Sequence, residues 1–381
     1  MQVKISIPEK SCSPGMSVQF DGKRFSKTHD PESWWMESGQ NETRSLDESM
    51  SLFGRTPPSI VSQGQRDAYG SLTSSEIPWM QAIGKEKYLS VVKSAHSSVV
   101  DWLQDESTKK YVDTHIKCRS LLMSLEPASI DAREFEARRK SPSVESFIPT
   151  SGRFAAVPRY SQVTQTGRLK VIDGPKILTI SKADRRVISS RFSGGRILQV
   201  DYVSLEPRVA LYTAGVKPDG EDVYDWISRS IGGGHSRSKV KVPTLSVLYG
   251  QGSKNDDPVS SSIREEVKRV FKIDELMQRL RSEGNTNGFG RPLEDCEDRL
   301  LIPHYTQSTA VDVALLGFNT LIQDLGSHVG NGIVPIFVLH DALILDVSPE
   351  LYGHLRNRVS MGVEVSPLGR FPLSLGPIWD E

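Results

Sequence analysis

Two acidic residues stand beside apolar segments, where a carboxylate is well placed to bind a metal ion. Asp341 lies between the runs IVPIFVL and ALILDV, and Asp201 follows the run ILQV. A carboxylate next to a hydrophobic core is costly to desolvate unless it is paired or bound to a cation. If the two segments are neighbouring strands, the acids can share a pair of Mg²⁺ ions about 3.5–4 Å apart, an arrangement that assists in-line phosphoryl displacement.

Each acid also has a simpler structural explanation. His340 and Asp341 fit the tip of a tight β-hairpin, where Asp is common for turn reasons alone. Asp201 fits an ordinary turn between a strand and a helix, with Ser204 as the helix cap and Pro207 in the first turn. Both explanations stay open, because a sequence does not show which strands are neighbours.

A stripe of basic, apolar and aromatic residues recurs at every fourth position of HSRSKVKVPTLSVLYG, namely Arg237, Lys241, Leu245 and Tyr249. On a helix, its basic end can hold a triphosphate and its aromatic end a flat base. A half-buried helix with snorkelling cations gives the same pattern. Pro243 interrupts the segment, so the helix either begins near Lys239 or is kinked.

The composition indicates a soluble globular protein. With 381 residues, 37% of them hydrophobic, the chain is long enough for two or three domains. Lys plus Arg and Asp plus Glu number 47 each, so a polyanion would have to meet a local basic surface. Three widely spaced cysteines form no zinc or disulfide pattern, which indicates a reducing cytoplasm. No apolar run approaches the ~20 residues of a membrane span, so we expect no membrane association.

The chain changes character along its length. Up to about residue 80 it is rich in Ser, Gly and Pro, which predicts an irregular N-terminal extension. Apolar residues at helical spacing predict two antiparallel helices between residues 86 and 125, closed by Pro127. After residue 150, short apolar runs alternate with helical segments without regular βαβ repetition, which favours an α+β architecture.

A series of segments carries these residues in one order from about residue 155 to residue 381: TGRL, DYVSLEPRV, RSKVKVPTLSVLYG, NGFGRPLED, QSTAVDVAL and LHDAL. The series resembles the motifs of the family A DNA polymerases, the group of bacterial DNA polymerase I and many phage replicases. DYVSLEPRV resembles motif A, RSKVKVPTLSVLYG resembles motif B and LHDAL resembles motif C. The other three segments resemble the family's T-G-R-L-S-S, G-R-R-R-x-L-P-D and Q-G-T-A-A-D stretches.

The resemblance implies an α+β right-hand polymerase fold with an antiparallel palm sheet, helical fingers and a partial helical thumb. The palm would comprise residues 151–215 and 302–381, the fingers residues 216–301, and the thumb-like region residues 81–150, after the extension of residues 1–80. The first 150 residues contain no convincing set of exonuclease acids and are too short for both an exonuclease domain and a thumb. We therefore expect a short form without 3′-5′ proofreading.

The resemblance also assigns roles at the metal site. Asp201 and Asp341, with the main-chain carbonyl of Tyr202, would ligate two Mg²⁺ ions, for which Mn²⁺ could substitute. Lys241 would act in catalysis by protonating pyrophosphate. Nucleotide-binding roles fall to Arg237, Lys241, Leu245, Tyr249, Glu206 and His340. Glu206 would be the steric gate that rejects a ribose 2′-hydroxyl.

DNA-binding roles are implied for Arg168 and Gln307, which would read the minor groove at the primer end, and for Arg299 at the template backbone. The partners would be primer-template DNA, dNTPs and a processivity or replisome factor. The compartment would be the cytoplasm of a bacterial or phage-infected cell.

Several residues depart from the family's pattern. Ala342 replaces the second acid of motif C, which predicts altered metal binding without loss of chemistry. Leu245 replaces an aromatic ring that stacks on the incoming base, at a cost of ~1–3 kcal/mol in nucleotide binding. Pro243, Ser246 and Pro303 also differ from the usual residues.

Two other functions fit the same residues. A single-subunit RNA polymerase shares the acids, the basic stripe and the His-Asp pair, although Glu206 favours deoxynucleotides. An inactive polymerase-like DNA-binding or replisome scaffold protein would explain the departures. However, such a scaffold has no physical need for two metal-binding acids.

Overall fold

The structure is a computed structural model that describes residues 5–7, 18–26, 34–35, 50, 84–218, 222–232, 234–250 and 258–379. The chain divides into two compact units, Met1–Ile116 and Lys117–Glu381. Most of the predicted N-terminal extension lies outside the described residues. Its described part contains a four-stranded sheet of order β3-β2-β1-β4, formed by β1 (Ile5–Ile7), β2 (Val18–Phe20), β3 (Phe25–Ser26) and β4 (Trp34–Trp35).

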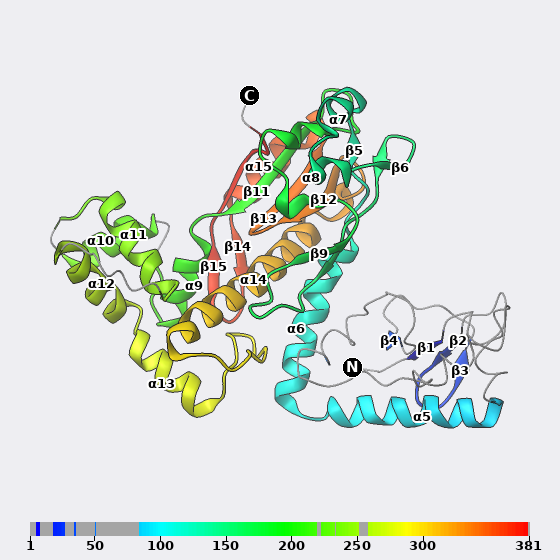
Figure 1. The fold of residues 1–381 in the computed structure, drawn as a ribbon, viewed down its shortest axis with the longest axis horizontal. Coiled ribbons are helices and arrows are strands. Elements are labelled where there is room, and N and C mark those ends of the chain that lie inside the picture. Colours follow the sequence, from blue (N-terminus) through cyan, green and yellow to red (C-terminus); the bar gives the residue numbers. More distant parts are fainter. Residues whose placement is uncertain are drawn as a thin grey trace. The chain divides into compact units, whose positions relative to one another are not determined.

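Two helices occur where the sequence predicts them, α5 (Lys85–Trp102) and α6 (Glu106–Met123). The apolar face of α5 includes Tyr88, Val92 and Val99, and the ring of His96 on the same helix contacts Phe20 of β2 at 5.4 Å between centroids. Within the first unit, α5 and the beginning of α6 meet at a corner and do not lie side by side (Figure 1). The prediction of an antiparallel pair is therefore wrong, because α5 packs against the N-terminal strands.

The second unit is built on a four-stranded antiparallel sheet of order β12-β13-β11-β16. Its strands are β11 (Arg196–Tyr202), β12 (Ile333–Leu339), β13 (Ala342–Val347) and β16 (Leu373–Pro377). β12 and β13 form a hairpin closed by His340 and Asp341, as the apolar runs predict. The mixture of helices with an antiparallel sheet confirms the α+β class.

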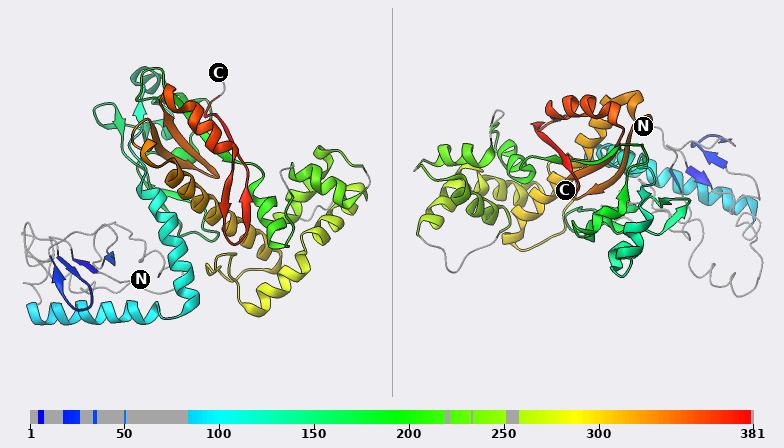
Figure 2. Two further views of the ribbon diagram at one scale, coloured as in Figure 1. Left: turned by 180° about the vertical axis from the view of Figure 1, so that it is seen from behind. Right: turned by 90° about the horizontal axis from the view of Figure 1, so that it is seen from above.

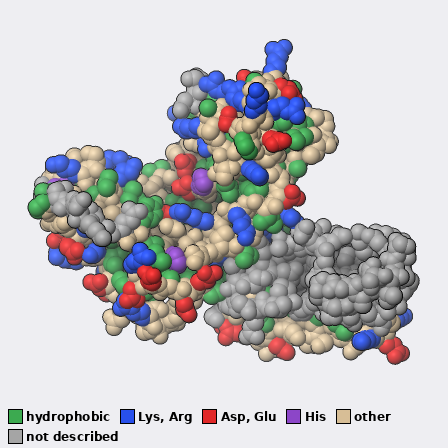
Figure 3. Space-filling view, in the orientation of Figure 1, with side chains coloured by type: hydrophobic (Ala, Val, Ile, Leu, Met, Phe, Trp, Pro, Cys, Tyr) green, Lys and Arg blue, Asp and Glu red, His purple; other side chains and the backbone are tan. Residues whose placement is uncertain are grey.

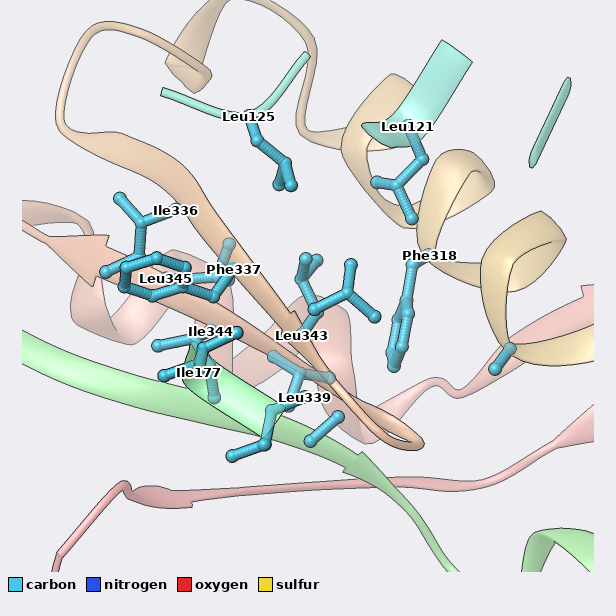
Figure 4. Close-up of a cluster of buried hydrophobic side chains, with 14 of the residues drawn as sticks. Leu121, Leu125, Ile177, Phe318, Ile336, Phe337, Leu339, Leu343, Ile344 and Leu345 are labelled. Carbon is cyan, nitrogen blue, oxygen red and sulfur yellow. The ribbon is translucent and has the colours of Figure 1, made fainter. Parts of the chain in front are cut away.

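Both faces of the sheet are covered, so β12 and β13 are buried along their whole length. α14 (Asp298–Leu325) and α15 (Tyr352–Ser360) lie on one side of the sheet, and the segment 126–195 lies on the other (Figure 2). Leu343 points toward Phe318 of α14, whereas Ile344 lies beside Ile177 of η1 (Ile177–Thr179) (Figure 4). Period-two alternation along β13 therefore supplies both hydrophobic layers.

The edge of the sheet at β12 is closed by a tyrosine. The hydroxyl of Tyr160, on β8 (Arg159–Ser161), donates to the carbonyl of Val338 at 2.8 Å and accepts from the N–H of Val338 at 3.1 Å. An exposed strand edge is a site for unwanted pairing, and this contact blunts it. β8 pairs with β9 (Lys170–Asp173), so the loop that carries TGRL is anchored beside the hairpin of β12 and β13.

A second hydrophobic cluster, separate from that of the sheet, joins the helices between the strands. These helices are α9 (Leu205–Thr213), α10 (Val223–Ile231), α11 (Arg237–Leu248), α12 (Pro258–Val270) and α13 (Ile273–Glu283). α14 belongs to both clusters, with Leu301 and Tyr305 in this one and Phe318 in that of the sheet. In the described part of residues 216–301, predicted as fingers, the structure has the helices α10 to α13 and a non-helical stretch at 284–297. The predicted limits of palm, fingers and thumb stay predictions.

Short elements complete the described part of the second unit. They are β5 (Ser129–Ile130), α7 (Ala132–Arg138), α8 (Pro142–Glu145), β6 (Pro149–Ser151), β7 (Phe154–Ala155), η2 (Asp184–Val187), β10 (Ile188–Ser189), η3 (Gly326–His328), η4 (Pro349–Leu351), β14 (Val363–Val365) and β15 (Gly369–Phe371). In the described part of the chain, no helix has the length and apolar character needed to cross a bilayer.

A buried acid holds the sheet at the end opposite to the hairpin tip. Asp346 of β13 is 1% exposed. Its carboxylate accepts hydrogen bonds from the Ser190 hydroxyl and from the backbone N–H of Arg191 at 2.8 Å, and its Oδ2 lies 3.3 Å from Nε of Arg191. These contacts attach the segment that leads into β11.

We expect Asp346→Ala to lower the free energy of unfolding by about 3 kcal/mol, because the Ser190 hydroxyl and the backbone N–H of Arg191 lose their buried acceptor. The Arg191 guanidinium loses one carboxylate neighbour as well, although it keeps Glu126 at 2.7 Å. Urea unfolding of the full chain measures this change. The matched control is Glu364→Ala, which removes an exposed acid facing Arg370 and should change the free energy by less than about 1 kcal/mol. Equal effects of the two variants would contradict the role of Asp346.

Candidate active site

The two acids singled out by the sequence lie on neighbouring strands. Asp201 of β11 is paired across the sheet with Ala342 of β13, and Asp341 directly precedes Ala342. Asp341 is exposed at the hairpin tip, and Asp201 is half-buried at the end of its strand. His340, beside Asp341, is exposed and has φ 56°, in the left-handed region that favours glycine. The register therefore brings the two carboxylates to the same end of the two central strands.

The environment of Asp201 fits a cation. Burial, and secondly the charge of Asp341, raise the pKa of Asp201 from 3.8 to about 6, and a hydrogen bond from the backbone of Tyr202 opposes them. Oδ1 of Asp201 is buried and accepts no hydrogen bond from the described residues. Carboxylate and carbonyl oxygens are the ligands that Mg²⁺ prefers. Among the described residues no group of three or more acidic, His or Cys side chains forms a metal site, so a cation here would need backbone or substrate oxygens as well.

The side chain of Tyr202 anchors the end of β11. It is 5% exposed, and its hydroxyl donates to the carbonyls of Val313 and Ala314 in α14 at 3.1 and 3.3 Å. A Cβ at Gly317 would lie 2.0 Å from that hydroxyl, so glycine is required for this close approach. The side chain of Tyr202 thus has a structural role, and only its main chain is available for the predicted metal contact.

Glu206 links two other predicted site residues, Tyr249 and Arg168. It lies in the first turn of α9 and accepts hydrogen bonds from the Tyr249 hydroxyl at 2.6 Å and from the Arg168 guanidinium at 3.0 Å. Burial, and secondly the hydrogen bond to Glu206, raise the pKa of Tyr249 well above its usual range, so it stays a hydrogen-bond donor. The segments that resemble motif A, motif B and the TGRL stretch therefore meet at one carboxylate.

A cavity of about 690 Å³ opens beside this group, a volume typical of small-molecule sites. Its wall includes Arg168, Tyr249 and Gln307, all predicted site residues, together with His304. Arg299 does not line the cavity. It is exposed and forms an ion pair with Glu297 at 2.6 Å. Arg299 is therefore not brought together with the other predicted site residues, and its contact with a template stays a prediction.

The basic stripe lies on the open face of α11. Arg237 and Lys241 are exposed, Leu245 is half-buried and Pro243 is buried. Because α11 begins at Arg237, Pro243 sits in the helix interior, and the predicted alternative of a helix start near Lys239 is wrong. Figure 3 shows Lys and Arg side chains along the hollow between these helices and the sheet.

Several residues that the sequence did not single out support this site. Arg291, 1% exposed, donates to the carbonyl of Gln162 at 2.6 Å, and a Cβ at Gly167 would collide with its guanidinium. Asn287 donates to the equally buried Asp312 at 2.6 Å. This buried network holds the loop that carries Arg168 against α14. Only the hydrophilic letters of NGFGRPLED hinted at it, because a sequence does not show that an arginine is buried.

No protein-family model and no curated protein matches the chain. Among solved structures, the chain is similar to the POL domain of Pol1 from M. smegmatis in complex with DNA primer-template and dNTP, with a TM-score of 0.46 and 16% sequence identity. The similarity covers 87% of this chain and 62% of that one, so the chain spans less than two thirds of its length. A similarity at this level is too low to assign a function.

Asp201 makes the stability of the metal-free protein depend on pH. Its pKa of about 6 in the folded chain exceeds the ordinary 3.8, so the folded state binds the proton more tightly and loses stability as the pH rises between these values. We expect Asp201→Asn to match the wild type near pH 4 in urea unfolding with EDTA, and to be more stable at about pH 8. Added Mg²⁺ should stabilise only the wild type. A difference that does not change with pH would contradict this assignment.

Proposed function

We propose that the protein is a template-directed DNA polymerase that adds deoxynucleotides to a primer 3′-hydroxyl by two-metal phosphoryl transfer. The observation that carries the proposal is the register that brings Asp201 and Asp341 together at one end of the central strands of an antiparallel sheet. The cations of α11 and the cavity beside Tyr249 belong to the same unit and support it. In this proposal the sheet is the palm and the helices α10–α13 are the fingers of a right-hand fold.

The acids and the cations have separate tasks in this reaction. Two Mg²⁺ ions, when bound, would activate the 3′-hydroxyl and neutralise the charge that develops on the triphosphate. Asp201, Asp341 and the main-chain carbonyl of Tyr202 would hold them. Arg237 and Lys241 would bind the phosphate oxygens, and Lys241 would donate a proton to the leaving pyrophosphate. His340 would contact the substrate beside Asp341.

The group around Glu206 would select the sugar and hold the duplex. Glu206 is fixed by Tyr249 and Arg168, so its carboxylate would leave no room for a ribose 2′-hydroxyl. Arg168 and Gln307 share the cavity wall and would contact the minor groove at the primer end, while Leu245 would face the incoming base. We also propose that the chain lacks 3′-5′ proofreading, and removal of a mismatched 3′ nucleotide without dNTPs would contradict this.

We expect Asp341→Asn to reduce primer extension with Mg²⁺ and dNTPs by at least about 100-fold. The reason is that one of the carboxylates that would hold the metal ions, and through them stabilise the developing charge, is lost. Asp341 is exposed in a turn, so the variant should fold normally. Glu364→Gln, which neutralises an exposed acid on β14, is the matched control and should extend at the wild-type rate. Equal extension by Asp341→Asn would exclude the two-metal assignment, and an inactive wild type would favour a DNA-binding scaffold.

We expect Glu206→Ala to raise the use of ribonucleotides relative to deoxynucleotides by about tenfold or more, a change of about 1.4 kcal/mol in discrimination. The ratio of kcat/KM for rNTPs and dNTPs measures it. Tyr249→Phe keeps the ring and removes only the hydrogen bond to Glu206, so it should show a smaller change of the same sign. A wild type that prefers rNTPs would identify an RNA polymerase instead.

A further inference from the structure

The carboxylate of Asp222 makes two kinds of contact, one with each oxygen. Asp222 caps α10, where its Oδ1 accepts hydrogen bonds from the backbone N–H groups of Tyr224 at 2.9 Å and Asp225 at 3.2 Å. Its Oδ2 accepts a hydrogen bond from the guanidinium of Arg237 at 2.9 Å. The capping residue therefore also holds Arg237, the first cation of the α11 stripe. Its hydrogen bonds to the start of α10 fix the position of its carboxylate.

The ring of Tyr224 lies under both cations of the stripe. The guanidinium carbon of Arg237 is 5.1 Å from the ring centroid, and Nζ of Lys241 is 5.9 Å from it. Both distances fall within the range of cation–π attraction. Tyr224 is 4% exposed, so the ring is a fixed surface.

Asp222 thus holds one edge of the Arg237 guanidinium and the Tyr224 ring supports its face. The Arg237 side chain is nevertheless 46% exposed. A guanidinium has five N–H donors, and Asp222 takes one of them. The remaining donors can reach an anion from solvent while the group keeps one orientation. Preorganised donors of this kind lose less freedom when they bind phosphate oxygens.

Tyr224 also connects the stripe to the acids. Its side chain interacts electrostatically with Ser204 and with Glu206. Ser204 lies three residues after Asp201, at the start of α9. The position of the cations is therefore tied to the strand end that carries the first acid.

We propose that Asp222 and Tyr224 are positioning residues that orient Arg237 and Lys241 toward the polyphosphate of a nucleotide. This inference rests on the proposed function for the identity of the nucleotide reaction. Its own content is narrower: Asp222 strengthens polyphosphate binding through Arg237, although it carries the same sign of charge as the ligand.

The test uses the full chain and measures binding of inorganic tripolyphosphate by calorimetry, together with KM and kcat for dNTPs in primer extension. Asp222→Asn keeps an oxygen for the helix cap and removes the ion pair. We expect the dissociation constant and the KM to rise about 5- to 10-fold, with kcat within about twofold. Tyr224→Leu should have an effect of the same sign, and Tyr224→Phe, which keeps the ring, should bind tripolyphosphate nearly as the wild type does.

Asp225→Asn is the matched control. Asp225 is exposed in the same turn and acts on Arg237 only through space, so its variant should bind at least as tightly as the wild type. In an Arg237→Gln background, Asp222→Asn should have no further effect. Tighter or unchanged binding by Asp222→Asn, or a full effect without Arg237, would overturn the inference. Because tripolyphosphate binding needs no polymerisation, an inactive wild type would refute the proposed function and leave this result to stand alone.

Discussion

The antiparallel register between β11 and β13 is the constraint on which the candidate site depends. It places Asp201 opposite Ala342 and therefore beside Asp341. A slip of one residue would turn Asp201 to the other face of the sheet and separate the acids. The register is held at one end by Tyr202 on α14 and at the other by Asp346, while Tyr160 closes the free edge. These contacts lie away from the two acids and hold them close together despite their mutual repulsion.

Helix α14 connects the sheet to the second hydrophobic cluster, because its residues pack in both. Pro303 has no N–H, so the carbonyl of Arg299 lacks its usual partner one turn later. Gly250 packs against that carbonyl so closely that a Cβ would lie 2.2 Å from the oxygen. This approach fixes the end of α11, and with it Tyr249, on the helix that also anchors Tyr202. The sheet and the helical region thus share one rigid element.

The sequence was sufficient where local pattern decides structure and insufficient where burial does. Two apolar runs around His340 and Asp341 predicted the hairpin, and four-residue spacing predicted the open stripe of α11. The role of Asp222 was missed, because an Asp in the sequence looks the same whether it only caps a helix or also binds an arginine. The α5–α6 pairing failed because an apolar stripe does not name its partner, and here it packs against distant N-terminal strands. Helix α11 continues through Pro243 despite the low helix propensity of proline, because the buried face of α11 packs into the second cluster.

The left-handed backbone at His340 has a consequence for how this chain can change. A non-glycine residue in this region costs roughly 1–2 kcal/mol, and glycine would relieve it at the tip of a tight hairpin. Directed evolution for thermal tolerance alone should therefore replace the imidazole readily. If His340 contacts the substrate as proposed, selection for catalysis should retain it beside Asp341, and the two regimes would drive the same codon in opposite directions.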